Sequence, residues 1–393
     1  MNETVATWQP AHYPRPITVF GSWTPRQLQI LSEEVGSSIS LAANVILVAL
    51  ILSEKNEVLK SYSRILLLNC VVDVIYTLAC ATNVLQFEIY NGYFMFINNG
   101  FFKDAPMSLL YFLGWFWSWA CGLAIYAIPF MFYYRYNLIC KGETLTMQKF
   151  FLALLMPIIA PTFDAFVLTS SFWGMRDRRE LFCQEFLNHP VWVMPNEGIP
   201  SNCLLSGDRT DIWLLLFCIG VCFKGTSVYG TTIWFGMNIH RAMKESNKKA
   251  SRKTIKMQSQ LTRILVIQAT LPLLTAVMPC MVMLALIVFK INVRGAGLCI
   301  SGMLSWIPVV NPLSSIFLVS NYRKKLLGTV LRILPKNKYI QRRLDATSHT
   351  GKTSHIHPSR QSSTAPARTT GVSGGADIAT EGVDIANINT ESQ

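Results

Sequence analysis

The chain has 393 residues, of which 51% are hydrophobic and 15% charged, and its formal net charge is +13. The apolar residues gather in seven long runs, each about long enough to cross a bilayer as a helix. Because the positive charge lies in the segments between these runs, it is a topology signal and a preference for anionic lipid rather than a sign of nucleic-acid binding. The runs are Val35–Leu52, Ile65–Phe87, Met107–Phe132, Phe150–Phe172, Ile212–Met237, Ile264–Phe289 and Gly297–Ser320. We therefore predict an all-α membrane protein, a seven-transmembrane helix bundle over residues 35–320.

The distribution of Lys and Arg predicts which way the bundle faces. With the N-terminus outside, the outer segments carry nine basic residues and the inner segments carry twenty-five, with Lys224 left inside a span. Positively charged loops stay in the cytoplasm because their translocation is unfavourable. The sequence therefore predicts a multi-pass protein of the cell membrane with an extracellular N-terminus.

The first 34 residues are expected to form that extracellular segment. They are polar, contain several prolines and lack the charged start and apolar run of a secretory signal, so the first span must direct insertion. Asn2 begins an Asn-Glu-Thr glycosylation sequon on the predicted outer side. Such triplets are common by chance, so Asn2 supports the topology only weakly.

The third span ends in an aromatic cluster around one basic residue, Phe132-Tyr133-Tyr134-Arg135-Tyr136. One interpretation is an interfacial aromatic belt with an arginine that follows the positive-inside rule. The other is a functional arginine at the cytoplasmic boundary. The cluster alone favours the first interpretation.

Prolines interrupt the last two spans. The seventh contains Trp306-Ile307-Pro308-Val309-Val310-Asn311-Pro312, and Pro272 and Pro279 lie in the sixth. Each proline weakens the helical hydrogen-bond ladder, and Asn311 can bond a carbonyl that is released. Bent sixth and seventh helices beside a third helix that ends in arginine indicate a bundle that can switch between states.

Two segments follow the seventh span. Over residues 321–335, leucine and valine recur at helical spacing among basic residues, which predicts an amphipathic helix on the inner leaflet. From Lys336 onward, Ser, Thr, Gly, Ala and Asn replace the large apolar residues. Such a segment cannot bury enough apolar surface to fold, so residues 336–393 are expected to be a disordered cytoplasmic tail.

Taken together, these motifs resemble those of a G-protein-coupled receptor, and more closely the nematode serpentine chemoreceptors of the Str and Srd kind. The similarity covers roughly residues 35–334. The residues that carry it are Asn44, the run Ile65–Asp73 with Asn69, the triplet Tyr134-Arg135-Tyr136, the pair Asn311-Pro312, and Asn321-Tyr322-Arg323. The resemblance implies a chemosensory receptor that binds a small odorant- or pheromone-like ligand and activates a heterotrimeric G protein.

The resemblance also implies roles and partners. The expected coupling and switch residues are Asn44, Asn69, Asp73, Tyr134, Arg135, Tyr136, Asn311, Pro312, Tyr322 and Arg323. Arrestin would bind through the Ser/Thr-rich tail, and a sensory cilium would be a fitting location. Membrane lipid is a further partner, and no cofactor, metal or nucleic acid is expected.

The sequence departs from the broader receptor pattern at three places. Tyr134 stands where an acidic residue usually precedes the arginine, and Ser315 where a tyrosine usually follows Asn-Pro. The outer end of the third span has no cysteine to tether it to the second extracellular loop. In that loop, Cys183 and Cys203 can pair with each other in the oxidising exterior, although free thiols and a bond to another chain are alternatives.

Three charged residues lie inside predicted spans, where a charge costs about 3 kcal/mol on insertion scales. Asp164 and Lys224 fall near mid-depth on the fourth and fifth spans, so they could form a buried ion pair. That pair would serve structure alone or would also contact ligand, and the first alternative is favoured. Asp73, with Asn44 and Asn311, resembles the polar centre that couples ligand to the cytoplasmic face.

Aromatic and methionine residues at outer depth are candidates for the ligand pocket. Such a lining suits a small, mostly apolar ligand. Most aromatic residues in a span face lipid or core instead. The candidates are Tyr111, Trp115, Trp119, Trp213, Phe217, Met281, Met303 and Trp306.

Two other classes of protein can contain seven membrane helices. A seven-helix ion channel or transporter would show recurrent polar residues along several spans, which this chain lacks. A membrane enzyme would need clustered His, Cys or carboxylates, yet all six histidines fall outside the predicted spans. The chain is therefore not expected to be an enzyme, and the channel or transporter is the alternative to the receptor.

Overall fold

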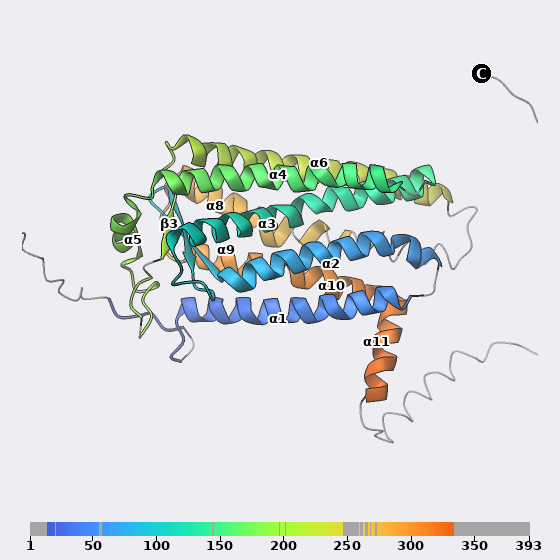
Figure 1. The fold of residues 1–393 in the computed structure, drawn as a ribbon, viewed down its shortest axis with the longest axis horizontal. Coiled ribbons are helices and arrows are strands. Elements are labelled where there is room, and N and C mark those ends of the chain that lie inside the picture. The colour runs from blue at the N-terminus through green and yellow to red at the C-terminus, as the bar shows by residue number, and fades with distance from the viewer. Residues whose placement is uncertain are drawn as a thin grey trace, which may run out of the picture. The chain divides into compact units, whose positions relative to one another are not determined.

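The computed structural model describes the chain between residues 14 and 333, with gaps (Figure 1). The described residues are 14–19, 21–54, 57–143, 145–195, 197–200, 202–246, 259, 262–263, 266–267, 269–271 and 273–333. Asn2 and residues 336–393 lie outside these ranges, so the predicted glycosylation site and tail stay predictions.

Among the described residues, seven helical stretches are long and apolar enough to cross a membrane, which confirms the predicted fold class. They are α1 (Pro25–Leu52), α2 (Glu57–Asn83), α3 (Met107–Tyr136), α4 (Met147–Gly174), α6 (Ile212–Ser246), the sixth span ending in α8 (Met278–Val288), and α9 (Ala296–Leu304) with α10 (Ile307–Leu318). Figure 1 shows α3, α4 and α6 side by side, and α2 between α1 and α3. Single turns of π-helix, η1 (Asn137–Lys141) and η2 (Leu273–Val277), follow α3 and precede α8.

The first helix begins at Pro25, so the last ten residues of the segment predicted as an N-terminal extension are helical. Thr24 and Gln27 form a capping box at its start: the Gln27 amide NH donates to the Thr24 hydroxyl at 3.3 Å, and the Gln27 side chain accepts from the Thr24 NH at 2.9 Å. Hydropathy missed this part because Arg26 and Gln29 are polar. Both are buried, in hydrogen bonds to other parts of the chain.

The second predicted span runs too far, because α2 ends at Asn83 rather than at Phe87. Val84 has a φ of 43°, a left-handed conformation that is unfavourable for a β-branched residue and that ends the helix. The chain then forms a hairpin of β1 (Leu85–Tyr90) and β2 (Tyr93–Asn98). Residues 85–87 are therefore strand, where the sequence analysis predicted helix.

A three-stranded antiparallel sheet covers one end of the bundle, which we call the sheet end. Its strand order is β1-β2-β3, with the short β3 (Cys203–Leu205) paired to β2 so that Met95 faces Leu205. Asn91 and Gly92 form the two-residue hairpin turn, with φ values of 52° and 84°. Positive φ at both positions is what a type I′ turn requires, and Asn-Gly supplies it readily.

A disulfide joins Cys183 to Cys203 at the sheet end. Cys183 lies on the short helix α5 (Arg179–Leu187), and Cys203 is the first residue of β3. The bond therefore ties the loop after α4 to the sheet. Both cysteines are buried with Met95, Phe186 and other residues of an apolar cluster.

The seventh span is two helices rather than one. The chain leaves the helical path at Ser305 and Trp306, and α10 begins at Ile307 with Pro308 as its second residue. Proline lacks an amide hydrogen, so it suits the first turn of a new helix. The break leaves α9 beside β1 and α10 beside α1 and α2.

A further helix, α11 (Ser320–Ile333), covers most of the segment predicted to be amphipathic. Figure 1 shows it turning away from the direction of α10 beside the end of α1. Lys325 holds it there, with its ammonium 3.1 Å from the Glu54 carboxylate and donating to the Ser53 carbonyl at 2.8 Å. We call this end of the bundle the α11 end.

Candidate functional site

A cavity of about 60 Å³ lies beneath the sheet. Most of its lining is aromatic, aliphatic or sulfur-containing. The lining residues are Phe87, Phe94 and Phe96 of the sheet, Trp117, Ser118, Cys121, Gly122 and Ile125 of α3, Leu168 of α4, Phe217, Val221, Lys224 and Gly225 of α6, and Val277, Cys280, Met283 and Leu304. The apolar character of this lining suits an apolar molecule.

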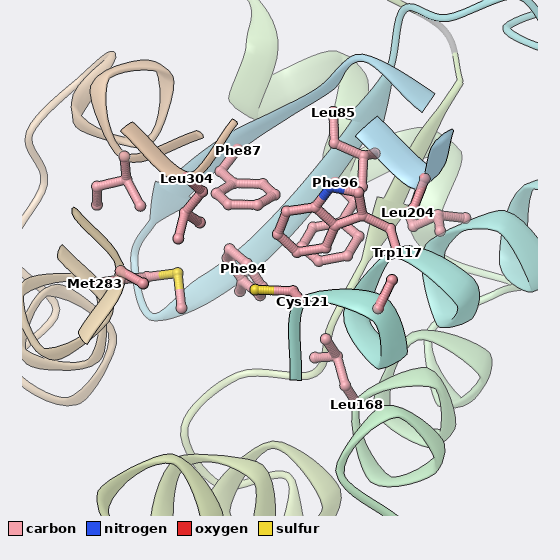
Figure 2. Packing of buried hydrophobic residues seen from close by; sticks show 14 of the residues in the cluster. Leu85, Phe87, Phe94, Phe96, Trp117, Cys121, Leu168, Leu204, Met283 and Leu304 are labelled. Atoms are coloured by element: carbon pink, nitrogen blue, oxygen red, sulfur yellow. The ribbon is translucent and has the colours of Figure 1, made fainter. Parts of the chain in front are cut away.

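The hairpin forms the roof of this cavity. Phe87 stacks on Phe96 with ring centroids 4.9 Å apart, and its ring meets Trp117 edge-on at 5.3 Å. Figure 2 shows these three rings together on one side of the cluster, with Met283 and Leu304 approaching from another. Gly297 of α9 lies so close to the Phe87 backbone that a Cβ there would overlap the Phe87 carbonyl. The roof strand is therefore fitted against α9 with no space for a side chain between them.

Among the described residues, one charged side chain, that of Lys224, lines the cavity. Its ammonium lies 3.0 Å from the Asp164 carboxylate of α4, and the two side chains are only 12% and 14% exposed. The Tyr126 hydroxyl donates to the same carboxylate at 3.5 Å. An isolated charge would be costly to bury, and pairing offsets much of that cost. The pair is thus a nearly neutral but strongly polar group at the edge of an apolar space.

A buried polar core lies between α1, α2 and α10. The Asn311 amide donates to one oxygen of Asp73 at 2.8 Å, and the Asn69 amide donates to the other at 3.3 Å. Asp73 is 1% exposed. Asn44 is also buried, but its amide donates to the Ser40 carbonyl within α1 rather than to Asp73.

Serine and threonine hydroxyls extend this core toward the break in the seventh span. The Ser40 hydroxyl lies 2.7 Å from that of Thr77 and donates to the Pro308 carbonyl at 3.0 Å. Thr77 donates in turn to the Asp73 carbonyl at 2.7 Å. Three helices are therefore linked by hydrogen bonds at the start of α10.

Arg135 is buried at the α11 end, with its guanidinium 5.0 Å from the centre of the Tyr62 ring. Tyr134 is buried and meets Phe150 edge-on at 6.1 Å, while Tyr136 packs against Phe235 of α6 at 5.4 Å. These ring contacts join α3 to α2, α4 and α6. An arginine this deeply enclosed is not a residue of an exposed interfacial belt.

Comparison with known proteins decides the family. The sequence profile of the family described as "Serpentine type 7TM GPCR chemoreceptor Str" matches residues 29–327. The chain belongs to this family. The crystal structure of squid rhodopsin is similar to the receptor, with a TM-score of 0.54 and 13% identity over 88% of this chain and 98% of that chain. At that identity the likeness shows the fold alone. The comparison with curated proteins gave no match.

The predicted ligand residues of this Str receptor do not form one site. Phe217 alone among them lines the cavity, and Met303 and Trp306 line a separate groove between α1 and α9. Trp115 and Trp119 stack on each other at 6.2 Å as partly exposed rings, and Trp119 donates to Thr162 of α4. Tyr111 is buried elsewhere, and Trp213 and Met281 are 39% and 40% exposed.

Sequence reasoning chose the wrong face of α3 for the cavity. Trp117 and Cys121, four residues apart, line it, whereas Trp115 and Trp119 lie on another face. The roof phenylalanines were missed because the hairpin was not predicted. The Asn91-Gly92 pair between two apolar, aromatic segments was a usable hairpin signal.

The remaining predicted residues lie at the α11 end. Tyr322 is buried in the apolar cluster there, whereas Arg323 is exposed. Pro312 is buried inside α10. In the described part of the chain, no group of three or more His, Cys, Asp or Glu residues could hold a metal ion.

Burial changes the acidity of one carboxyl group outside the spans. Glu88 of β1 has a fully buried side chain, and desolvation raises its pKa from 4.5 to about 7. A hydrogen bond from the Gly295 amide at 3.3 Å and the Arg294 guanidinium at 3.7 Å act in the opposite direction. The roof is therefore fastened to the start of α9 through a group that titrates near neutral pH.

Proposed function

We propose that this Str receptor is a chemosensory G-protein-coupled receptor that binds a small, mostly apolar molecule in the cavity beneath the sheet. The observation that carries the proposal is the position of Leu304. It lines the cavity, it is the last residue of α9, and the break that follows leads directly to α10. A molecule that pushes on Leu304 would move the helix that carries Asn311, the hydrogen-bond partner of Asp73.

A contact from α2 supports this route. The Tyr76 hydroxyl donates to the Leu304 carbonyl at 3.2 Å, and the Tyr76 side chain is fully buried. The same helix carries Asp73 one turn away, so α2 contacts both the cavity wall and the polar core. Because packed cores adopt discrete arrangements, a small shift at Leu304 can select another state of α10.

The chemistry of the cavity limits the ligand. Its walls are aromatic and aliphatic, and Asp164 already neutralises its one cation. A ligand with a net charge would have to leave water without a counter-ion, which is costly. The proposed ligand is therefore an uncharged odorant- or pheromone-like molecule, with at most a few polar atoms.

The α11 end is the proposed site of G-protein coupling. Arg135 lies there between Tyr62 and the ring contacts of α3 with α6, and outward movement of α6 would uncover it. A helix of the G protein inserted beside Arg135 could accept hydrogen bonds through its backbone carbonyls. The exposed Lys324 on α11 adds positive charge that favours an acidic partner. Arrestin binding to the tail is a further proposal.

The deciding experiment is a panel of small volatile and apolar compounds, applied to cells that express the chain, with a second-messenger or calcium readout. Arg135→Ala should retain surface level and ligand binding and lose the response, because it removes the group that contacts the G protein. Lys149→Ala, at an exposed basic residue near the same end that is not among the predicted coupling residues, is the control. Full signalling by Arg135→Ala at wild-type surface level would remove Arg135 from the mechanism. Ligand-gated current without any G-protein signal would favour a channel.

We also propose that the N-terminus is outside the cell and that the receptor resides in the plasma membrane, with a sensory cilium as a fitting location. The twenty-five to nine distribution of basic residues supports this orientation. Tags at residues 1 and 393 should be reached from outside and inside respectively in unpermeabilised cells. An N-terminal tag reached only after permeabilisation would reverse the orientation and remove the coupling proposal.

A further inference from the structure

A second groove opens between α1 and α9 at the sheet end. Its volume is about 720 Å³, and none of the described residues lines both it and the cavity beneath the sheet. Leu28 and Gln29 of α1 form one wall, and Leu298, Gly302 and Met303 form the other. The groove is mainly apolar, and exposed side chains such as Leu31 and Val35 continue along α1 beside it.

In the part of the chain that the structure describes, the groove has one charged lining residue, Arg294, at the end near the start of α9. Its Nη1 donates to the Phe186 carbonyl and lies 3.7 Å from Glu88, and the guanidinium lies 3.5 Å from the centre of the Tyr90 ring. Both polar contacts use Nη1. Within the described residues, no hydrogen bond engages Nε or Nη2, and arginine carries five N–H donors in a planar fork.

The charge of Arg294 is only partly compensated. Because burial raises the pKa of Glu88 to about 7, this carboxyl balances the charge of Arg294 only in part at neutral pH. Burial and Arg294 lower the pKa of the nearby His189, which carries no negative charge in either protonation state. A positive charge therefore remains at one end of the apolar groove.

We propose that this groove binds a single-chain amphiphile with an anionic head group, of the fatty-acid class. Its carboxylate would pair with the outer N–H groups of Arg294, and its hydrocarbon chain would lie between α1 and α9. Arginine matches a carboxylate in charge and geometry, and the apolar walls match the chain.

The shape of the groove favours one chain over the two of a phospholipid. A Cβ built on Gly302 would lie 3.9 Å from Cγ of Gln29, so α1 and α9 approach each other closely at that level. The α9 helix is about 13 Å long at 1.5 Å per residue, which leaves room for a chain that enters from the leaflet at the sheet end.

The inner end of the groove reaches the break in the seventh span. Trp306 lines the groove, and its indole NH donates to the Ser32 hydroxyl at 3.0 Å. Trp306 directly precedes α10, the helix that carries Asn311. A bound chain would therefore contact the same break as an occupant of the central cavity, from its other side, and could modulate the receptor.

The test is a binding measurement that does not depend on signalling. Purified receptor in nanodiscs of phosphatidylcholine would be titrated with tritiated palmitic acid at pH 7.4, with empty discs subtracted. Wild-type receptor should show saturable binding. Arg294→Gln should lower the affinity about tenfold, because one charge-assisted contact is lost, and Arg294→Lys should retain most of it. Arg176→Gln, at an exposed arginine of the same end, is the charge control.

A second variant tests the position of the chain. Gly302→Leu should abolish saturable binding, because its side chain would fill the groove while its Cβ meets nothing closer than 3.9 Å. Gly230→Leu, at an exposed glycine of α6 with nothing within 4 Å, is the matched control. Thermal melting of each variant would show that it is folded.

Methyl palmitate tests the head group. It should compete weakly with palmitate on the wild type, and acid and ester should compete equally on Arg294→Gln. Equal competition by acid and ester on the wild type would overturn the proposal, as would unchanged palmitate binding in folded Arg294→Gln and Gly302→Leu receptors. Because the readout is binding alone, a failure here differs from the absence of a second-messenger response, which bears on the proposed function.

Discussion

The roof of the central cavity and the polar core are both buried, but they depend on different kinds of sequence information. The roof pairs residues 95–97 of the hairpin with residues 203–205, which are brought together only by tertiary structure. The polar core depends on single polar residues in apolar helices, Asp73 and Asn311 above all. A polar residue in a span differs in hydropathy from its neighbours and is easily identified. An apolar strand that follows a span has the same hydropathy as the helix, so it is assigned to the helix.

The ion pair at the cavity edge offers the largest expected effect. Asp164→Ala or Lys224→Ala should lower surface expression several-fold, because breaking a buried pair leaves one uncompensated charge at a cost of about 3–5 kcal/mol. The double change to Ala should recover much of the loss, since neither charge remains. Flow cytometry of tagged receptor measures this. Losses that simply add would show that the two residues act independently.

Two tryptophans on α3 separate the predicted face of that helix from the observed one. Trp117 is 6% exposed and contacts the roof, whereas Trp115 is only partly buried. Trp117→Ala should destabilise the purified receptor by about 3–5 kcal/mol, the usual cost of removing a core tryptophan, and Trp115→Ala by much less. Thermal unfolding in detergent compares them. A larger loss for Trp115→Ala would restore the face that the sequence analysis favoured.

The limits of prediction from sequence follow from the same contrast. The seven spans were predictable because runs of about 20 consecutive apolar residues are rare outside membrane-spanning helices. The start of α1 at Pro25 was missed, since Arg26 and Gln29 satisfy their polar groups by bonding Gln86 of β1 rather than water. Hydropathy cannot register a polar residue whose partner is about sixty positions away.

Within the site, the sequence identified the important polar residues better than it identified which of them contact each other. Asp164 and Lys224 were expected to meet, and their carboxylate and ammonium lie 3.0 Å apart. Asn44 was grouped with Asp73, yet its side chain bonds Ser40 of its own helix. Periodicity places a residue at a depth, but which face of the helix is turned inward depends on how the neighbouring helices pack.

The attachment of the roof should depend on pH. The folded-state pKa of Glu88, about 7, lies above its ordinary value of 4.5, so the folded protein binds more protons between these values than the unfolded one. Stability from this group is therefore fully present at low pH and falls as pH rises toward 7, by up to about 3 kcal/mol. Glu88→Gln should flatten the dependence of melting temperature on pH between 5 and 8.

Other groups near the roof must be separated from Glu88. Arg294 faces it from the start of α9, and His189 lies near Arg294 with a pKa lowered by burial. His189→Gln is therefore the control, and it should keep most of the slope between pH 5 and 7. Because the pKa of His189 is lowered in the folded state, its own contribution to stability rises with pH, opposite in sign to that of Glu88. A fall in stability between pH 5 and 7 that survives unchanged in Glu88→Gln would show that this carboxyl is not its cause.

The smallest expected effect compares two asparagines of the polar core. Asn311→Ala removes the 2.8 Å donor to Asp73 and leaves that carboxyl with the longer bond from Asn69, so it should cost about 1–3 kcal/mol. Asn44→Ala removes bonds to the carbonyl and hydroxyl of Ser40 in its own helix and should cost less. Because Asn311 joins α10 to α2, its loss should also change ligand potency, whereas the loss of Asn44 should leave potency near the wild-type value.

The exchange Asp73→Asn with Asn311→Asp would restore a carboxyl–amide bond and should recover stability relative to Asn311→Ala. Equal losses of stability in the two single alanine variants, with no recovery in the exchanged pair, would mean that the bond between α2 and α10 is not important for the switch.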